Sequence, residues 1–113
     1  MGALADEVVL IVGGSSSIGP SMCSRFLDAG ARVIVTYHSK TPPGSTNSFS
    51  ACTLDLNSDE SIRNFGDQLN DLTPALDVVI FLSGILPGRN LAAYSFGDID
   101  MVMSVNFNGQ AKL

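Results

Sequence analysis

Basic residues are scarce in this chain of 113 residues, which has 6 Lys and Arg against 11 Asp and Glu and a formal net charge of −5. The few cations are spread along the sequence and form no cluster. This balance argues against a nucleic-acid surface and against a polybasic patch that binds membranes. An anionic ligand would therefore be held mainly by backbone dipoles.

Long apolar runs are also missing. The longest, Val8–Val12 and Val78–Leu82, are far too short to span a bilayer. Asp6 and Glu7 stand where a secretory signal peptide would have basic residues. Asp6 also occupies the position at which myristoylation of Gly2 would need Ser or Thr. We therefore expect a cytoplasmic protein with no membrane association.

Cysteine is limited to Cys23 and Cys52, and their separation matches neither a metal-binding pattern nor a disulfide scaffold. We expect both to be reduced, buried thiols, and we expect no metal site. The composition is that of a globular protein, 45% hydrophobic and 15% charged. The length allows a single core, so residues 1–113 are interpreted as one domain.

The first half of the chain reads as strand, turn, helix and strand. The run Val8–Val12 is rich in β-branched residues, which is typical of a strand buried on both faces of a parallel sheet. Pro20 suits the first position of a helix, where its missing N–H costs nothing. Met22 and Phe26 share one face of that helix. Arg32–Thr36 is the second strand, which completes a right-handed βαβ unit.

The pattern continues as an α/β fold. Residues 37–48 contain two prolines and no helical period, so they are expected to form a loop. Phe49–Leu54 and Asp77–Leu82 are expected to be strands, with a helix between them. Asn57 or Ser58 caps that helix, and Pro74 ends it. Its buried stripe is expected to be Ile62, Phe65 and Leu69.

The last expected element is a helix from about Gly97 to the end of the sequence. Apolar residues recur on it at helical spacing and predict one buried seam. Asn106 is the single polar side chain on this seam, and one interpretation is a core amide that finds a hydrogen-bond partner. The seam residues are Ile99, Val102, Asn106, Gly109 and Leu113.

The turn after Val12 has the features of a phosphate-binding site. Bare backbone N–H groups and a positive helix terminus converge there. A Walker A loop would use Gly14 and Gly19, but Pro20 then stands at its lysine position, which argues against ATP or GTP hydrolysis. The pattern Gly-x-x-x-Gly-x-Gly fits Gly13 and Gly19, with Ser17 at its middle position. Tight packing without a ligand is the alternative explanation.

Residues 13–19, GGSSSIG, resemble the cofactor turn of the short-chain dehydrogenase/reductase family, and among its members the 3-oxoacyl-carrier-protein reductases. The resemblance covers the whole chain. Asp55-Leu56 resembles the pair that contacts adenine, and Ser83-Gly84 stands where the family has the end of Asn-Ala-Gly. Asn106 resembles an asparagine that interrupts a helix and holds a water in a proton relay. An ordinary residue at the entry to a helix is the alternative for Asp55.

The resemblance implies a Rossmann-type parallel sheet with strand order 3-2-1-4, flanked by helices, and a dinucleotide cofactor. Asn106 would be the one catalytic position present. The implied cofactor-binding residues are Gly13, Ser15, Ser16, Ser17, Ile18, Gly19, Tyr37, His38, Asp55, Leu56, Ser83 and Gly84.

NADP(H) is favoured over NAD(H) by the end of the second strand. NAD-selective domains carry an acid there that binds the ribose 2′-hydroxyl. This chain instead has Tyr37, His38 and, two residues on, Lys40. These residues would tolerate a 2′-phosphate, although a solvated loop position is the alternative for His38.

Several departures from the family pattern bear on activity. Ser17 replaces a glycine, and we expect its hydroxyl to bind cofactor phosphate or ribose; steric obstruction of the cofactor by this side chain is the alternative. Leu82 replaces an asparagine, and the helix between the second and third strands is missing. The sequence holds no Tyr-x-x-x-Lys, because Thr41 follows Tyr37 at the fourth position and Asp98 follows Tyr94. In the family the tyrosine is the acid/base, so this chain alone is expected to be inactive.

The expected architecture is that of a reductase fold truncated before its later strands. The strand 77–82 would lie at an edge although it is apolar on both faces, which is a liability when exposed. The face over the second and third strands would lack a helix. We therefore expect a completing chain or a second copy at this edge. The alternative function is a non-catalytic nucleotide-binding or scaffold module.

Overall fold

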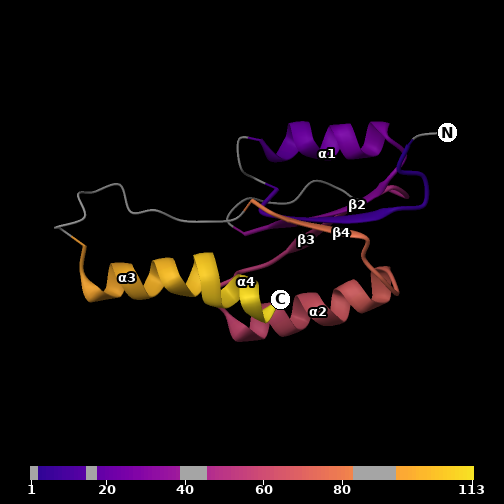
Figure 1. Cartoon of the computed structure of the whole chain (residues 1–113). Coiled ribbons are helices and arrows are strands. Elements are labelled where there is room, and N and C mark those ends of the chain that lie inside the picture. Colours follow the sequence, from indigo (N-terminus) through magenta and orange to yellow (C-terminus); the bar gives the residue numbers. More distant parts are fainter. Residues whose placement is uncertain (1–2, 15–17, 39–45, 83–93) are drawn as a thin grey trace.

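The computed structural model describes residues 3–14, 18–38, 46–82 and 94–113. Its centre is a four-stranded parallel sheet with the order β3-β2-β1-β4 (Figure 1), which confirms the predicted Rossmann-type arrangement. The sheet consists of β1 (Val8–Val12), β2 (Arg32–Tyr37), β3 (Phe49–Thr53) and β4 (Val78–Phe81). The helical elements are α1 (Gly19–Asp28), α2 (Asp59–Leu72), α3 (Phe96–Met103), the π-helix η2 (Ser104–Gly109) and α4 (Gln110–Lys112).

The sheet is covered by helices on both faces (Figure 1). Alternate residues of β1 point to opposite sides, as the pleat requires. Val9 and Ile11 pack with the apolar face of α1, whereas Leu10 and Val12 pack with that of α2. Because β1 lies between two strands and two helices, it is the most completely buried element, as its unbroken apolar sequence predicts.

The boundaries of the predicted elements differ from the observed ones by one or two residues. β2 extends to Tyr37, β3 ends at Thr53, and β4 is shorter at both ends than predicted. α1 begins at Gly19, one residue before Pro20. Part of the predicted loop 37–48 lies in residues 39–45, outside the described part of the chain.

The cap of α2 is Ser58, one of the two residues predicted. Its side-chain oxygen accepts a hydrogen bond of 3.1 Å from the Ser61 backbone N–H. Asp59 and Glu60 stand in the first turn, where the helix dipole favours negative charge. Ile62 and Phe65 are buried and Leu69 packs beside them, so the predicted stripe is confirmed.

The predicted seam of the last helix is wrong. Ile99, Asn106 and Leu113 are exposed, and of the five seam residues only Gly109 is buried. The exposure begins at Ile99, in the regular helix α3, so this face of the helix is not covered by the described residues; from residue 104 on the segment is a π-helix, which also departs from a 3.6-residue period. The interpretation of Asn106 as a core amide is therefore also wrong. The interruption of the helix at Asn106, which the family resemblance implied, is present.

β4 forms the edge of the sheet, as predicted. Val78 and Ile80 pack toward α1, whereas Val79 and Phe81 are each 44% exposed on the opposite face. The first helix after β4 in the described residues, α3, exposes further apolar side chains, among them Phe96 at 87%. None of the helices in the described part of the chain is long and apolar enough to cross a membrane.

Candidate functional site

The carboxyl ends of the four parallel strands meet at one edge of the sheet, at the left in Figure 1. In open α/β sheets this edge is where ligands bind. Gly13 follows β1, His38 follows β2, and Asp55 lies two residues beyond β3. The structure therefore gathers predicted site residues from three separate stretches of sequence.

The chain turns sharply out of β1 at Gly13, which has a φ of +97°. This left-handed conformation favours glycine because it has no Cβ. The Gly13 N–H donates a 3.0 Å hydrogen bond to Oγ1 of Thr36, a buried side chain on β2. The Gly14 N–H donates to the Thr36 carbonyl at 2.8 Å. Thr36, which sequence reasoning missed as a site residue, thus anchors the start of the turn twice.

Gly14 and Gly19 both lie where a side chain would collide with neighbouring atoms. A Cβ on Gly14 would lie 1.9 Å from Cγ1 of Val35 and 3.3 Å from Cζ of Tyr37. A Cβ on Gly19 would lie 2.4 Å from the Gly14 carbonyl oxygen. The first turn of α1 therefore sits directly on the strand-end backbone, as a phosphate cradle at a helix N-terminus requires.

Ile18 precedes α1 as its N-cap residue, is 54% exposed, and makes no side-chain capping hydrogen bond. The other predicted residues of the turn, Ser15, Ser16 and Ser17, lie outside the described residues. Ser83 and Gly84 lie outside them as well. The placement of these five residues is therefore untested.

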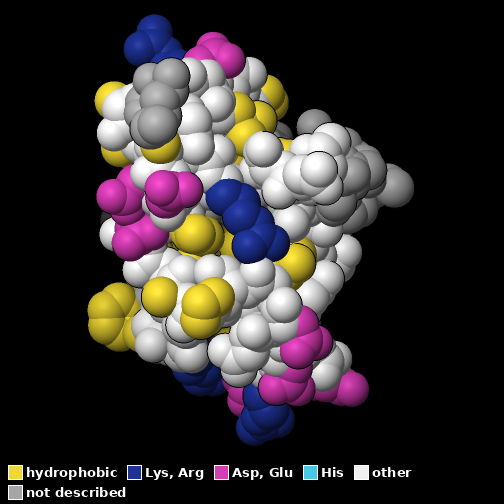
Figure 2. Space-filling view, turned by 90° about the vertical axis from the view of Figure 1, so that its right-hand side faces the viewer, with side chains coloured by type: hydrophobic (Ala, Val, Ile, Leu, Met, Phe, Trp, Pro, Cys, Tyr) yellow, Lys and Arg dark blue, Asp and Glu magenta, His cyan; other side chains and the backbone are white. Residues whose placement is uncertain are grey.

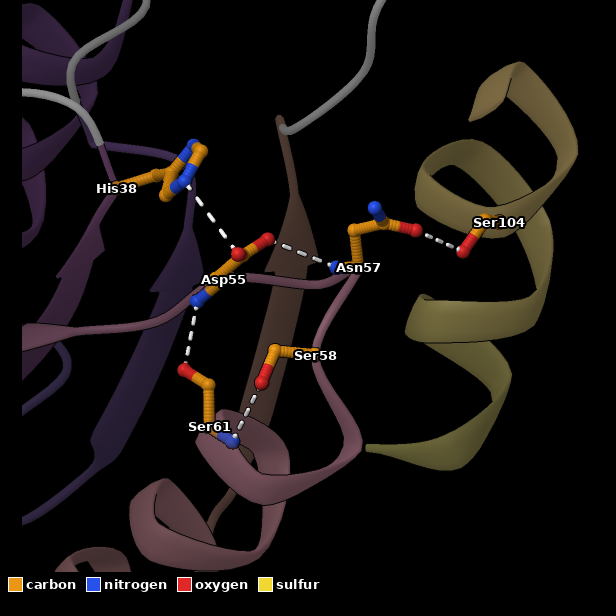
Figure 3. Close-up of polar contacts among 6 residues, drawn as sticks. All are labelled: His38, Asp55, Asn57, Ser58, Ser61 and Ser104. Carbon is orange, nitrogen blue, oxygen red and sulfur yellow. Dashed lines mark hydrogen bonds and ion pairs between the residues drawn. The ribbon is translucent and has the colours of Figure 1, made fainter. Parts of the chain in front are cut away.

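Asp55 lies at the corner between β3 and α2 and has three polar neighbours (Figure 3). Its Oδ1 accepts a 2.9 Å hydrogen bond from the Asn57 N–H, and its own N–H donates to Ser61 Oγ at 2.8 Å. Its Oδ2 lies 3.7 Å from Nε2 of His38. Asp55 thus shapes the chain at the entry to α2, whose cap is Ser58, while its Oδ2 lies on the side of His38.

Leu56 and Tyr37 differ from the polar residues around them. Leu56 is buried in the core under α2, so its side chain supports the corner. Tyr37 is half-buried against Gly14. Burial raises the pKa of its phenol, and the nearby Cys23 thiol adds to the rise. The phenol is therefore neutral at physiological pH and can donate a hydrogen bond.

Asn106 lies in η2, and the structure brings this element to the same corner from the side of α2. Ser104 donates its hydroxyl to Asn57 Oδ1 (Figure 3), and Gly109 packs against Leu56. Asn57, Ser104 and Gly109 were not predicted as site residues. Their contacts join residues about 50 positions apart, which no local pattern in the sequence shows.

Both cysteines are free, as predicted. Cys52 is buried and Cys23 is half-buried, and burial raises the pKa of both thiols, so both are protonated at neutral pH. No group of three or more His, Cys, Asp or Glu that could hold a metal ion occurs among the residues described.

The opposite end of the sheet, where the strands begin, carries mixed charge (Figure 2). Val8 N–H donates to Asp77 Oδ2 at 2.8 Å. The charge of Asp77, followed by a hydrogen bond between the two carboxyl groups, raises the pKa of Glu7. Arg32 donates to the Leu72 carbonyl at 2.6 Å. These contacts join strand starts and the end of α2, far from the glycine turn.

Comparisons with known proteins agree with this geometry. The family model for short chain dehydrogenases matches residues 7–113. A rhamnolipid-biosynthesis 3-oxoacyl-[acyl-carrier-protein] reductase of Pseudomonas aeruginosa is 28% identical over 111 residues. That alignment covers 92% of this chain and 43% of the reductase, so the chain spans less than half the length of this relative.

Solved structures show the same fold. A short chain dehydrogenase from Leptospira borgpetersenii with bound NAD⁺ superposes with a TM-score of 0.83 at 26% identity, over 96% of this chain and 43% of that one. The Pseudomonas aeruginosa RhlG/NADP complex superposes with a TM-score of 0.81 at 24% identity, over 96% and 45%.

Proposed function

This chain belongs to the short-chain dehydrogenase family, and we propose that residues 1–113 are the dinucleotide-binding domain of an oxidoreductase that interconverts a carbonyl and an alcohol. The observation that carries the proposal is the layered packing of Gly14 and Gly19 at the carboxyl end of β1. Because of this packing, the first N–H groups of α1 lie beside the carboxyl end of β1. Asp55 stands at the same edge, two residues beyond β3.

The cofactor residues of the proposal divide by the part of the dinucleotide they would bind. The glycine turn would hold the pyrophosphate through N–H groups and serine hydroxyls. Asp55 Oδ2 would accept from the adenine amino group. A bound nicotinamide supplies or accepts the hydride. The residues proposed to hold the cofactor are Gly13, Ser15, Ser16, Ser17, Ile18, Gly19, Tyr37, His38, Asp55, Leu56, Ser83 and Gly84.

We propose NADP(H) as the preferred cofactor. The described end of β2, at Tyr37 and His38, carries no acid that would hold a ribose 2′-hydroxyl and repel a 2′-phosphate. His38 is exposed, so its ring can turn toward a phosphate.

Fluorescence titration of the chain with NADPH and NADH tests the cofactor proposal. We expect saturable binding of both, with the tighter dissociation constant for NADPH. Absence of binding by either nucleotide would overturn the proposed function. Tighter binding of NADH would overturn the cofactor preference alone.

We further propose that this chain binds the cofactor without completing the reaction, because its sequence has no Tyr-x-x-x-Lys. We also propose a cytoplasmic location, where its free thiols stay reduced. NADPH oxidation measured with short 3-oxoacyl thioesters should stay at background for the chain alone. Turnover above background would contradict this proposal.

A second candidate role is favoured by the exposed edge. Val79 and Phe81 on β4, and the apolar side chains of α3, leave an apolar surface beside an unpaired strand. We propose that a completing polypeptide or a second copy covers this surface. If the chain proves to be an obligate oligomer without nucleotide affinity, a scaffold role replaces the enzymatic one.

A further inference from the structure

Both ends of η2 contact the same corner of the fold. Ser104, its first residue, donates a hydroxyl hydrogen bond to Oδ1 of Asn57 (Figure 3). Gly109, its last residue, lies so close to Leu56 that a Cβ would be 2.2 Å from the Leu56 carbonyl oxygen and 2.9 Å from the Leu56 Cβ. Leu56 and Asn57 are neighbours in the turn between β3 and α2, so one short segment receives both contacts.

This pair of contacts is compatible with a π-helix and incompatible with an α-helix. Residues five apart in an α-helix are separated by about 140° around the axis, so they face different directions. A π-helix has i→i+5 hydrogen bonds, which place residues five apart nearly one above the other. The position built for a Gly109 Cβ also lies 2.9 Å from the Ser104 carbonyl oxygen, as this stacking requires.

Two flanking contacts complete the docking of this helical segment. Val105 packs on the core face that contains Leu56 and Ile62. Lys112 Nζ lies 2.7 Å from Oδ1 of Asp59 at the start of α2. Both partners of this ion pair are more than half exposed, so it adds little energy. The contacts of the buried Gly109 and of Asn57 are therefore the ones that distinguish the π-helix from an α-helix.

We propose that Asn57 and Gly109 select the π-helical register of residues 104–109 and thereby act as positioning residues for Asn106. Asn106 lies within the selected turn, between the two contacts. Its use in a proton relay rests on the proposed function. The selection of the register depends only on the contacts at Leu56 and Asn57.

Nuclear magnetic resonance of the 113-residue chain tests this proposal through amide hydrogen exchange of residues 104–109 and the side-chain amide signal of Asn106. We expect Asn57→Ala to speed exchange in this turn by about fivefold, the effect of one lost hydrogen bond, and to move the Asn106 signal. Ser104→Ala should do the same, and the double variant should be no worse than either single one. Asn57→Asp keeps an acceptor for the Ser104 hydroxyl and should restore the wild-type pattern.

Asn108→Ala is the matched control, because Asn108 is an exposed residue in the same turn and should leave the Asn106 signal in place. Additive effects of Asn57→Ala and Ser104→Ala, or an undisturbed turn in both, would overturn the proposal. These measurements need no nucleotide. Loss of NADPH binding with the exchange pattern as expected would therefore refute the proposed function alone.

Discussion

Gly19 packs directly against the backbone of Gly14, and a Cβ on Gly19 would lie 2.4 Å from the Gly14 carbonyl oxygen. The backbone of Gly14 cannot move away easily, because Gly14 is itself packed against Val35 and Tyr37 on β2. The distance between α1 and the sheet is therefore determined by the absence of two side chains.

Replacing Gly19 with alanine should push α1 away from the strand ends. We expect Gly19→Ala to lower the free energy of unfolding by about 1–3 kcal/mol, because overpacking displaces a rigid backbone. NADPH affinity should fall roughly tenfold, because displaced N–H groups lose at least one hydrogen bond to phosphate. Thermal melts and fluorescence titration measure the two effects.

Gly66→Ala is the matched control for this variant. Nothing lies within 4 Å of a Cβ on Gly66, which stands in the interior of α2. Alanine there should raise the free energy of unfolding by about 0.5–1 kcal/mol and leave NADPH affinity unchanged. Equal NADPH affinity of Gly19→Ala and Gly66→Ala would contradict a phosphate site at the glycine turn.

His38 should determine how the chain distinguishes the two nicotinamide cofactors. We expect His38→Ala to weaken NADPH binding several-fold while NADH binding is unchanged, because only NADPH carries the 2′-phosphate. His38→Arg should strengthen NADPH binding, since a guanidinium binds phosphate bidentately. Parallel titrations with both nucleotides measure the ratio. Equal losses for NADPH and NADH in His38→Ala would refute the assignment.

The Glu7–Asp77 pair should make stability depend on pH. Asp77 raises the pKa of Glu7 in the folded chain above its ordinary value. The folded state then binds more protons than the unfolded state, so stability is highest below the unfolded pKa and falls as pH rises through the folded pKa. We expect Glu7→Gln to raise the melting temperature at pH 7 in low salt and to have little effect near pH 4.

Salt provides the control for this carboxyl pair. Both groups lie near solvent, so added salt screens their repulsion and should shrink the benefit of Glu7→Gln. Asp67→Asn, on the exposed surface of α2, should not reproduce the pH dependence. A Glu7→Gln benefit that is equal at pH 4 and pH 7 would show that the repulsion is not its cause.

A charge on the β4 edge should oppose association. Phe81 is 44% exposed, and lysine on an edge strand discourages pairing with another chain. We expect Phe81→Lys to lower the weight-average mass measured by light scattering, whereas Asn64→Lys on α2 should not. A wild-type chain that is already monomeric at high concentration would argue against association through this edge.

The sequence predicts the sheet well because its signals are local. The continuous apolar run predicts that β1 is buried, and the 3.6-residue stripe predicts which face of α2 is buried. The structure buries both. The predicted helix start at about Gly97 lies one residue from the observed start at Phe96, and the sequence also displays the capping box of Ser95 and Asp98 that marks it. That boundary was therefore available from the Ser-x-x-Asp pattern.

The candidate site was predictable only where it depends on backbone geometry. The positive φ of Gly13 follows from glycine at a strand end. The seam predicted through Asn106 is wrong from Ile99 on, because that face of α3 is exposed, and residues 104–109 depart from the 3.6-residue period as a π-helix. That register arises from contacts with Leu56 and Asn57. Because these residues are distant in the sequence, the spacing of side chains within the helix cannot predict the contacts.

The two neighbours of β1 enter the sheet after very different lengths of chain. The hydrogen bond from Gly13 to Thr36 closes a separation of 23 residues, whereas that from Val8 to Asp77 closes 69. This threefold difference adds about 1 kcal/mol of loop-closure entropy to the pairing with β4. Since β4 also has one unpaired side, it should join last during folding and detach first under denaturant. The strand that would receive further chain is thus the last part of this sheet to form.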